Sequence, residues 1–160
     1  MKTGEEGIAG AITEALALEK GLREFYAFVA SRAKGSLAKE MFEALRDMED
    51  RHLRYLDFLY RASSEGRELM GYRDFSSKIA ATHVESSVKI APAPKLFDEK
   101  ALKSNRDAVA YAHTLETKAQ NLYRTLAEKS ADAGEKAIFE EMLAQETRHI
   151  DYLKDLEKAL

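Results

Sequence analysis

Four long stretches of the chain repeat apolar residues in alternating steps of four and three, and this pattern constrains the fold more than any other feature. Such steps place side chains on one face of an α-helix, so each stretch is predicted to form a long amphipathic helix. The predicted helices span about residues 7–34, 36–62, 99–130 and 133–160. The two prolines of the 160-residue chain both lie within 91–95, so neither interrupts a helix.

The connections predict how these helices are arranged. Lys34–Ser36 and Ala133–Gly134 are short breaks, and short connections make consecutive helices antiparallel neighbours. We expect Gly35 to end the first helix and Ser36 to cap the second. The chain is therefore predicted to contain two helical hairpins, over 7–62 and 99–160.

A longer segment, Ser63–Asp98, connects the two hairpins. It is too long for a turn and too irregular for a further bundle helix, so we expect a crossover with a short helix around Ser76–Ala81. Its length leaves the direction of the third long helix open. Asp98 is predicted to cap that helix. We therefore predict an all-α fold: one domain over 1–160, an antiparallel four-helix bundle with a long crossover between helices two and three.

The two hairpins also repeat each other. "LEKGLREFY" (Leu18–Tyr26) aligns with "LETKAQNLY" (Leu115–Tyr123), and "FEALRDMEDRHLRYL" (Phe42–Leu56) with "FEEMLAQETRHIDYL" (Phe139–Leu153). Residues of the same type then pair at a constant offset of 97: Glu19 with Glu116, Tyr26 with Tyr123, Glu49 with Glu146, His52 with His149, and Tyr55 with Tyr152. This repeat predicts a duplicated hairpin and a bundle with approximate two-fold symmetry.

Six of the charged or ionisable residues lie in the apolar register of their helices, and are therefore predicted to point inward: Glu19, Glu49, His52, Glu116, Glu146 and His149. Isolated carboxylates in an apolar interior cost several kcal/mol each, and clustered carboxylates repel one another. Either most are protonated or cations neutralise them, and two divalent cations balance four carboxylates. Imidazole and carboxylate ligands suit iron, manganese or zinc.

The same six residues carry a resemblance to a known family. One Glu from each of two helices, with Glu-x-x-His from each of the other two, is the ligand set of ferritin-like dimetal carboxylate proteins. The chain resembles the rubrerythrin-type branch of the ferritin-like superfamily over nearly its whole length outside 63–98. The resemblance implies a diiron centre with oxidase, ferroxidase or peroxidase activity.

The spacing of the motif suggests a role for each ligand. Residues three apart share a helix face, so Glu49 and His52 reach one cavity. Glu49 and Glu146 are expected to bridge two metal ions, each of which is also held by one histidine. Glu19 and Glu116 are expected to be terminal ligands. Open positions on two adjacent redox metals favour two-electron oxygen chemistry over a structural role.

Other residues near the motif have weaker assignments. Tyr26 and Tyr123 are interpreted as core aromatics beside the site, with hydroxyls that bond a terminal glutamate. His113 is interpreted as a packed or surface histidine, and His83 and Glu85 match no ligand pattern.

The chain also departs from its relatives. It has no cysteine, whereas rubrerythrins proper add a rubredoxin domain with cysteine-bound iron. Ala119 stands where rubrerythrins carry an extra glutamate, which puts peroxidase activity of that kind in doubt. Asp50 stands where bacterioferritin has a haem-binding methionine, and no fifth helix follows His149, so a mineral-storing cage is less favoured.

Our leading hypothesis is an oxidoreductase with two metal ions, most favourably both iron, that reacts with dioxygen or hydrogen peroxide and receives electrons from an external donor. The alternatives are an iron-handling or storage protein with ferroxidase activity, and a bundle whose metal, such as zinc, is structural. The net charge of −3 and the absence of a long apolar run argue against nucleic-acid and membrane partners. We expect a cytoplasmic protein, and the residues leave open whether it forms a homodimer.

Overall fold

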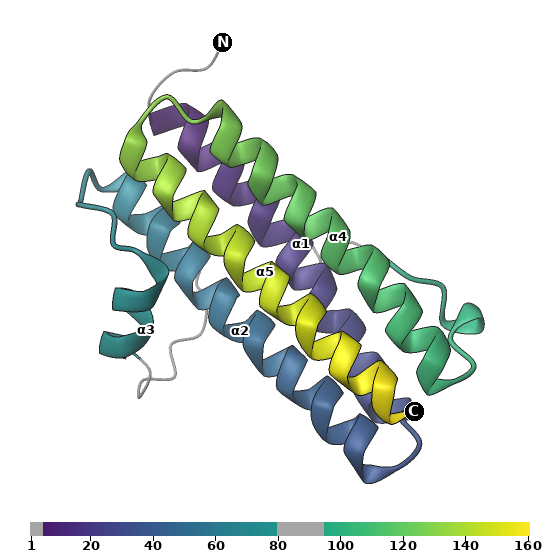
Figure 1. Cartoon of the computed structure of the whole chain (residues 1–160). Helices are drawn as coiled ribbons and strands as arrows, with labels where there is room; N and C mark the ends of the chain where they lie inside the picture. The colour runs from purple at the N-terminus through teal and green to yellow at the C-terminus, as the bar shows by residue number, and fades with distance from the viewer. Residues whose placement is uncertain (1–4, 80–94) are drawn as a thin grey trace.

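The computed structural model describes residues 5–79 and 95–160. These residues form α-helices, one short 3-10 helix and no strand, which confirms the predicted all-α fold (Figure 1). The elements are α1 (Glu5–Arg32), α2 (Ser36–Ser64), α3 (Tyr72–Ile79), η1 (Glu99–Ala101), α4 (Asn105–Lys129) and α5 (Ala133–Ala159).

The four long helices form a bundle of two hairpins. Helix α1 packs mainly against α2, and α4 packs mainly against α5, while α1 also contacts α4. The start of α4 lies beside the end of α1, where the Asn105 side chain accepts a hydrogen bond from Lys34 N at 3.1 Å and donates one to Lys34 O at 2.8 Å. Helix α4 therefore runs antiparallel to α1 and parallel to α2 (Figure 1). The sequence had left this direction open.

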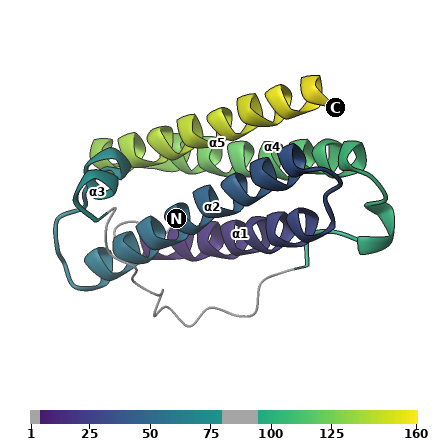
Figure 2. The same ribbon diagram turned by 90° about the horizontal axis from the view of Figure 1, so that it is seen from below.

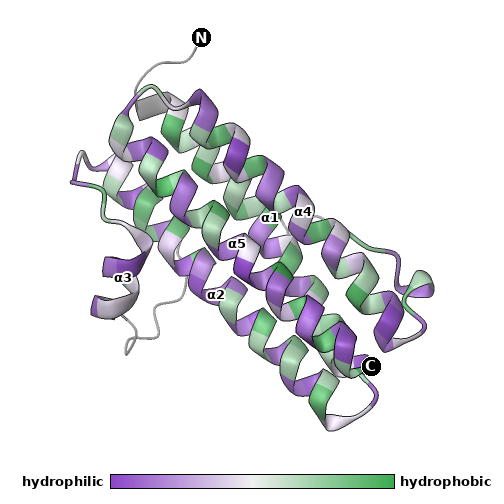
Figure 3. Cartoon of the chain, viewed as in Figure 1, coloured by the Kyte–Doolittle hydropathy of each residue, from purple (hydrophilic) through white to green (hydrophobic). Residues whose placement is uncertain are grey.

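The core consists of two apolar clusters, one toward each end of the bundle. One contains Phe25, Phe42 and Leu156, and the other contains Ile12, Leu59 and Phe139. Along each helix, hydrophobic residues alternate with hydrophilic ones in the helical period (Figure 3). Four glutamates and two histidines are also buried, at positions between those that supply the two clusters. The interior is therefore polar in its middle and apolar toward both ends.

The connection between α1 and α2 differs from the prediction. Gly35, rather than Ser36, is the N-cap of α2, and Ser36 is its first residue. Gly35 has a φ of 90°, a conformation that glycine adopts without the strain that a Cβ causes. Helix α1 ends earlier than expected, at Arg32, and Gly35 precedes α2 without a side-chain cap.

The start of α4 also differs from the prediction, whereas α5 begins at Ala133 as expected. Asp98 caps only the short η1 turn, and α4 begins six residues later than expected, where Ser104 accepts a hydrogen bond from Asp107 N. Asp132 caps α5 by accepting a bond from Glu135 N, so Gly134 lies inside the first turn of that helix. Both helices therefore begin after a residue whose short polar side chain accepts a hydrogen bond from the first turn.

Helix α3 lies against α2 and α5 near one end of the bundle (Figure 2). The predicted short helix around Ser76–Ala81 is thus present in its first part, although it begins earlier, and residues 80 and 81 lie outside the described residues. The Glu141 carboxylate of α5 accepts hydrogen bonds from Tyr72 N at 3.2 Å and Arg73 N at 2.9 Å. A carboxylate at a helix N-terminus satisfies free N–H groups and the helix dipole, so α5 fixes where α3 begins.

Candidate metal centre

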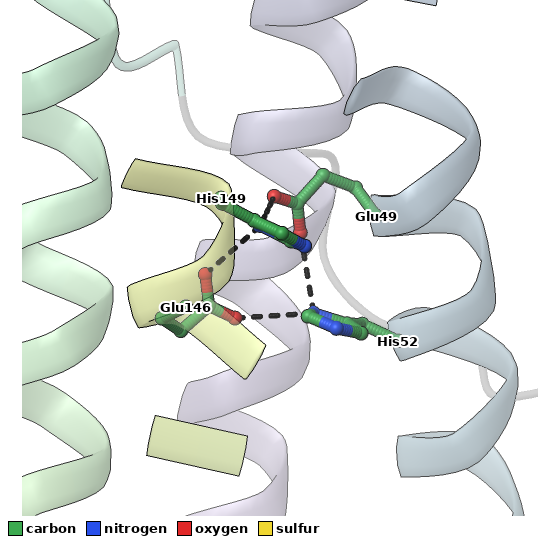
Figure 4. Close-up of side chains that lie close together, drawn as sticks. All are labelled: Glu49, His52, Glu146 and His149. Atoms are coloured by element: carbon green, nitrogen blue, oxygen red, sulfur yellow. Dashed lines mark ion pairs between the residues drawn. The ribbon is translucent and has the colours of Figure 1, made fainter. Parts of the chain in front are cut away.

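The six residues predicted to point inward meet in the middle of the bundle. Glu49 and His52 project from α2, and Glu146 and His149 project toward them from α5 (Figure 4). One ligand atom from each of these four residues lies within 4.8 Å of the others. Glu19 reaches the same place from α1, and Glu116 reaches it from α4. All four glutamates are fully buried, and the histidines are 1% and 2% exposed.

The ligand atoms are divided into two equivalent groups. His52 Nδ1 lies 3.3 Å from Glu19 Oε1, 3.6 Å from Glu49 Oε2 and 3.1 Å from Glu146 Oε1. His149 Nδ1 lies 3.4 Å from Glu116 Oε1, 3.0 Å from Glu49 Oε1 and 3.3 Å from Glu146 Oε2. Each group has one imidazole nitrogen and three carboxylate oxygens.

The two central glutamates belong to both groups. Glu49 turns one oxygen toward His52 and the other toward His149, and Glu146 does the same. Glu19 approaches only His52, and Glu116 approaches only His149. Glu49 and Glu146 thus face both histidines, and the assignment of bridging and terminal metal ligands stays a prediction. The imidazole rings of His52 and His149 stack at 4.8 Å with an angle of 13°.

Hydrogen bonding within the protein leaves this cluster incomplete. Eight buried atoms of the six residues make no hydrogen bond with described groups: one oxygen each of Glu19 and Glu116, both oxygens of Glu49 and Glu146, and Nδ1 of each histidine. A buried polar atom without a partner costs about 1–3 kcal/mol, so eight of them in one place require an explanation. Carboxylate oxygens and imidazole nitrogens are the ligands that iron, manganese and zinc accept, and the donor set therefore fits two such ions.

The pKa values show how unfavourable the cluster is without cations. Burial raises the pKa of Glu49 well above its usual range, and repulsion from Glu19 and Glu116 raises it further. Burial and the charge of Glu19 likewise raise the pKa of Glu146 to about 8. These carboxyls therefore retain protons that a bound cation would replace.

The terminal carboxyls shift the other way. Burial raises the pKa of Glu19, but the charge of His52 and the polar groups around this carboxyl more than offset it, so the pKa falls below its usual range. Burial also raises the pKa of Glu116, but the charge of His149 outweighs this effect, so the pKa of that carboxyl is lowered as well. Burial lowers the pKa of both histidines, and the surrounding carboxylates outweigh it, so each pKa is raised. Charge and burial thus oppose each other throughout the cluster.

Tyr26 and Tyr123 connect the two hairpins through the terminal glutamates. Tyr26 of α1 donates a hydrogen bond to Glu116 Oε1 of α4 at 2.5 Å, and Tyr123 of α4 donates one to Glu19 Oε1 of α1 at 2.6 Å. Burial and the neighbouring carboxylates raise the pKa of both phenols, which therefore stay protonated and able to donate. The expected contact between a tyrosine hydroxyl and a terminal glutamate is present, and in each case it crosses to the other hairpin.

The remaining candidates lie outside the cluster. His113 is half-buried, and its Nε2 is 3.6 Å from Glu157 Oε2 at the surface. Asp50 pairs with Arg23 of α1. Ala119 is buried in the apolar core. His83 and Glu85 fall outside the described residues.

One aromatic contact with the centre has no signal in the sequence. The Tyr72 ring of α3 packs edge-on against the His52 ring, with centroids 5.4 Å apart and an angle of 86°. Tyr72 lies in the crossover, which has no counterpart in the repeat, so neither periodicity nor the offset of 97 singled it out. Only the packing of α3 onto α2 brings it to the centre.

The fold and the buried cluster define the class of protein: a ferritin-like bundle with a carboxylate-histidine site for a pair of metal ions. The family model described as Rubrerythrin matches residues 11–157. The chain therefore belongs to the rubrerythrin family, whose members are ferritin-like diiron carboxylate proteins. No curated protein and no solved structure matched the chain. No helix within 5–79 or 95–160 is long and apolar enough to cross a membrane.

Proposed function

We propose that the protein is a diiron oxidoreductase that reduces hydrogen peroxide or dioxygen with electrons from an external donor. Glu49 and Glu146 would bridge the two irons, His52 and Glu19 would complete one site, and His149 and Glu116 would complete the other. When bound, the iron pair supplies two electrons, which with two protons reduce one hydrogen peroxide to two waters. The observation that carries the proposal is the pair of equal ligand groups that share two carboxylates.

The charges and the ligand count support this assignment. Four carboxylates balance two divalent cations, so loading the centre removes the repulsion that raises the pKa of Glu49. Four protein residues for each ion leave positions for a small molecule on an iron or manganese ion that takes about six ligands. The same four residues would complete the tetrahedral ligand set of a structural zinc. Ligands of imidazole and carboxylate suit iron and manganese, which change oxidation state, as well as zinc, which does not.

Side chains around the centre would orient its carboxylates and keep bulk water away from it. Tyr26 and Tyr123 keep the terminal carboxylates oriented by hydrogen bonds of 2.5 and 2.6 Å. Such outer partners tune a metal ligand and restrict its motion. The apolar clusters on both sides exclude bulk water, which favours small neutral oxidants over large or charged ones.

The test is a peroxide titration of the reduced, iron-loaded protein. Metal-free protein is loaded with two ferrous ions per chain without oxygen, and stopped-flow absorption follows the iron as peroxide or dioxygen is added. We expect one peroxide to oxidise both irons, and a chemical reductant to restore the starting spectrum. His113→Gln, which alters a histidine outside the cluster, is the matched control and should react as the parent does.

Other outcomes would support the alternatives. A protein that is purified with zinc, and whose iron-loaded form is inert to both oxidants, would contradict the redox proposal and favour a structural metal. Continued uptake of many irons per chain by a large shell, seen by native mass spectrometry, would favour iron storage. Binding of either metal should also raise the melting temperature. At a free metal concentration 100 times Kd, it adds about 2.7 kcal/mol to the free energy of unfolding.

A further inference from the structure

A cavity of about 450 Å³ lies between α2, α3 and α5, on the side of the bundle where Tyr72 covers His52. This volume is within the range of small-molecule sites in proteins. Its lining includes Arg51, Arg54, Tyr72, Arg73, Gln145 and Arg148. The cavity is separate from the metal centre, whose six ligands are not among its lining residues.

Arginines are concentrated in the lining of this cavity. Four of its lining residues are arginines, and none of the lining residues within 5–79 and 95–160 is acidic. In the described part of the chain, no carboxylate forms an ion pair with Arg51, Arg73 or Arg148. Other arginines do have such partners: Arg23 with Asp50, Arg61 with Asp57, and Arg67 with Glu65. Because the chain carries a net charge of −3, this concentration of positive charge is local.

Two of these arginines come from the internal repeat. Arg51 precedes His52 and Arg148 precedes His149, so they are equivalent positions of the two hairpins. Because α2 and α5 bring their histidines face to face, the residues beside them converge on one cavity. Gln145, one turn before Arg148, adds amide donors at the same place.

The third unpaired arginine is brought by α3, whose position is fixed. Glu141 holds the first two amides of α3, and the Tyr55 hydroxyl donates a 2.8 Å hydrogen bond to Met70 O just before it. A Cβ on Gly71 would lie 3.0 Å from Glu141 Oε2, so glycine allows this close approach. Arg73, the second residue of α3, thereby lines the same cavity as Arg51 and Arg148.

We propose that this cavity binds a small anion with two or more negatively charged oxygens, a polycarboxylate or a phosphate compound. Guanidinium groups bind carboxylate and phosphate oxygens in pairs of parallel hydrogen bonds, and several converging arginines favour a ligand with more than one such group. Tyr72 both lines the cavity and packs on His52, so the anion binds next to the metal centre without ligating it. The proposal does not depend on the identity or reactivity of the metal.

The test is calorimetric titration of the purified, metal-containing protein with citrate and, separately, with inorganic phosphate at constant ionic strength. Citrate represents the polycarboxylates and phosphate the phosphate compounds, so their relative affinities identify the source. We expect at least one to bind once per chain. Arg51→Gln and Arg148→Gln should each weaken that binding about tenfold, the equivalent of about 1.4 kcal/mol. Arg73→Gln should weaken it similarly, because α3 brings Arg73 into the same cavity.

Arg124→Gln is the matched control, since Arg124 is exposed on α4 and bonds only Asn121 among the described side chains. It should bind as the parent does. Unchanged affinity in Arg51→Gln and Arg148→Gln would overturn the proposal, because the anion would then bind elsewhere or directly to the metal. Absence of binding of both probes at millimolar concentration would overturn it as well. All three substituted arginines in the cavity are exposed, and circular dichroism checks that each variant is folded.

Discussion

The α1–α2 hairpin and the α4–α5 hairpin place the same side chains at the middle of the bundle and different ones outside it. At the middle, each hairpin gives one terminal glutamate, one bridging glutamate and one histidine, and each tyrosine crosses to bond the other hairpin's glutamate. Each of these groups depends on its counterpart, because a buried carboxylate is tolerated only with its full set of partners.

Away from the middle, equivalent positions differ in their surroundings. Tyr55 is fully buried and bonds Met70 O, whereas its equivalent Tyr152 is only half-buried. Glu141 caps α3, and its equivalent in the first hairpin is Ala44. Only one face of the bundle is covered by α3, which follows the first hairpin and has no counterpart after the second within the described chain. The two hairpins are therefore alike where their buried charged groups need each other, and they differ where the crossover and α3 contact only one side of the bundle.

The largest expected effect separates bridging from terminal ligands. Glu49→Gln and Glu146→Gln each remove a carboxylate that faces both histidines, so either should reduce iron from two ions to less than one per chain. Glu19→Gln and Glu116→Gln should each leave about one ion. Metal analysis after reconstitution and gel filtration measures these ratios. If Glu49→Gln retained both ions while Glu146→Gln lost them, the two hairpins would not be equivalent.

Next in size is the effect of the crossed tyrosines. Tyr26→Phe and Tyr123→Phe each remove one hydrogen bond to a buried carboxylate, and the loss of such an outer partner lowers metal affinity by about 10–100-fold. Equal losses would support two-fold symmetry at the centre. Competition with a chelator measures the affinity. A large loss in one variant with none in the other would show that only one terminal glutamate depends on its tyrosine.

A smaller effect is expected where the symmetry fails. Glu141→Ala removes the cap of α3 and should destabilise that helix by about 0.5–2 kcal/mol, a typical range for the loss of a cap. Hydrogen exchange in residues 72–79 should accelerate while metal content stays unchanged. Glu140→Ala, an exposed neighbour on α5, is the control and should leave this exchange unaltered. Equal acceleration in both variants would show that Glu141 does not fix α3.

The smallest difference is expected between Tyr55 and Tyr152. Tyr55→Phe loses the bond to Met70 O and should lower the free energy of unfolding by about 0.5–1.5 kcal/mol. Tyr152→Phe should change it by less than about 0.5 kcal/mol, as is usual for partly exposed positions. Urea denaturation of both variants provides the comparison. Equal losses would mean that the hydrogen bond from Tyr55 to Met70 O adds no more stability than the partly exposed Tyr152 hydroxyl does.

The sequence predicted the helices and the six buried ionisable residues because both follow from local periodicity. Glu49 and His52 share the register of Leu45 and Leu56, and that register alone sends them inward. Helix ends were predicted less well: Asp98 and Ser104 are both plausible caps, and the choice depends on how the chain meets the end of α1. Two further features had no local signal: the contact of the Tyr72 ring with His52, and the place of Arg73 in the same cavity as Arg51 and Arg148.

The sequence by itself determined that four amphipathic helices form and that each carries acids or histidines on its buried face, because the helical period is a property of the local chain. The tertiary structure decided that α4 runs parallel to α2, which tyrosine bonds which glutamate, and which face α3 covers. Those outcomes depend on contacts between residues far apart in the chain, such as Lys34 with Asn105 and Glu141 with Tyr72, and no local pattern encodes them.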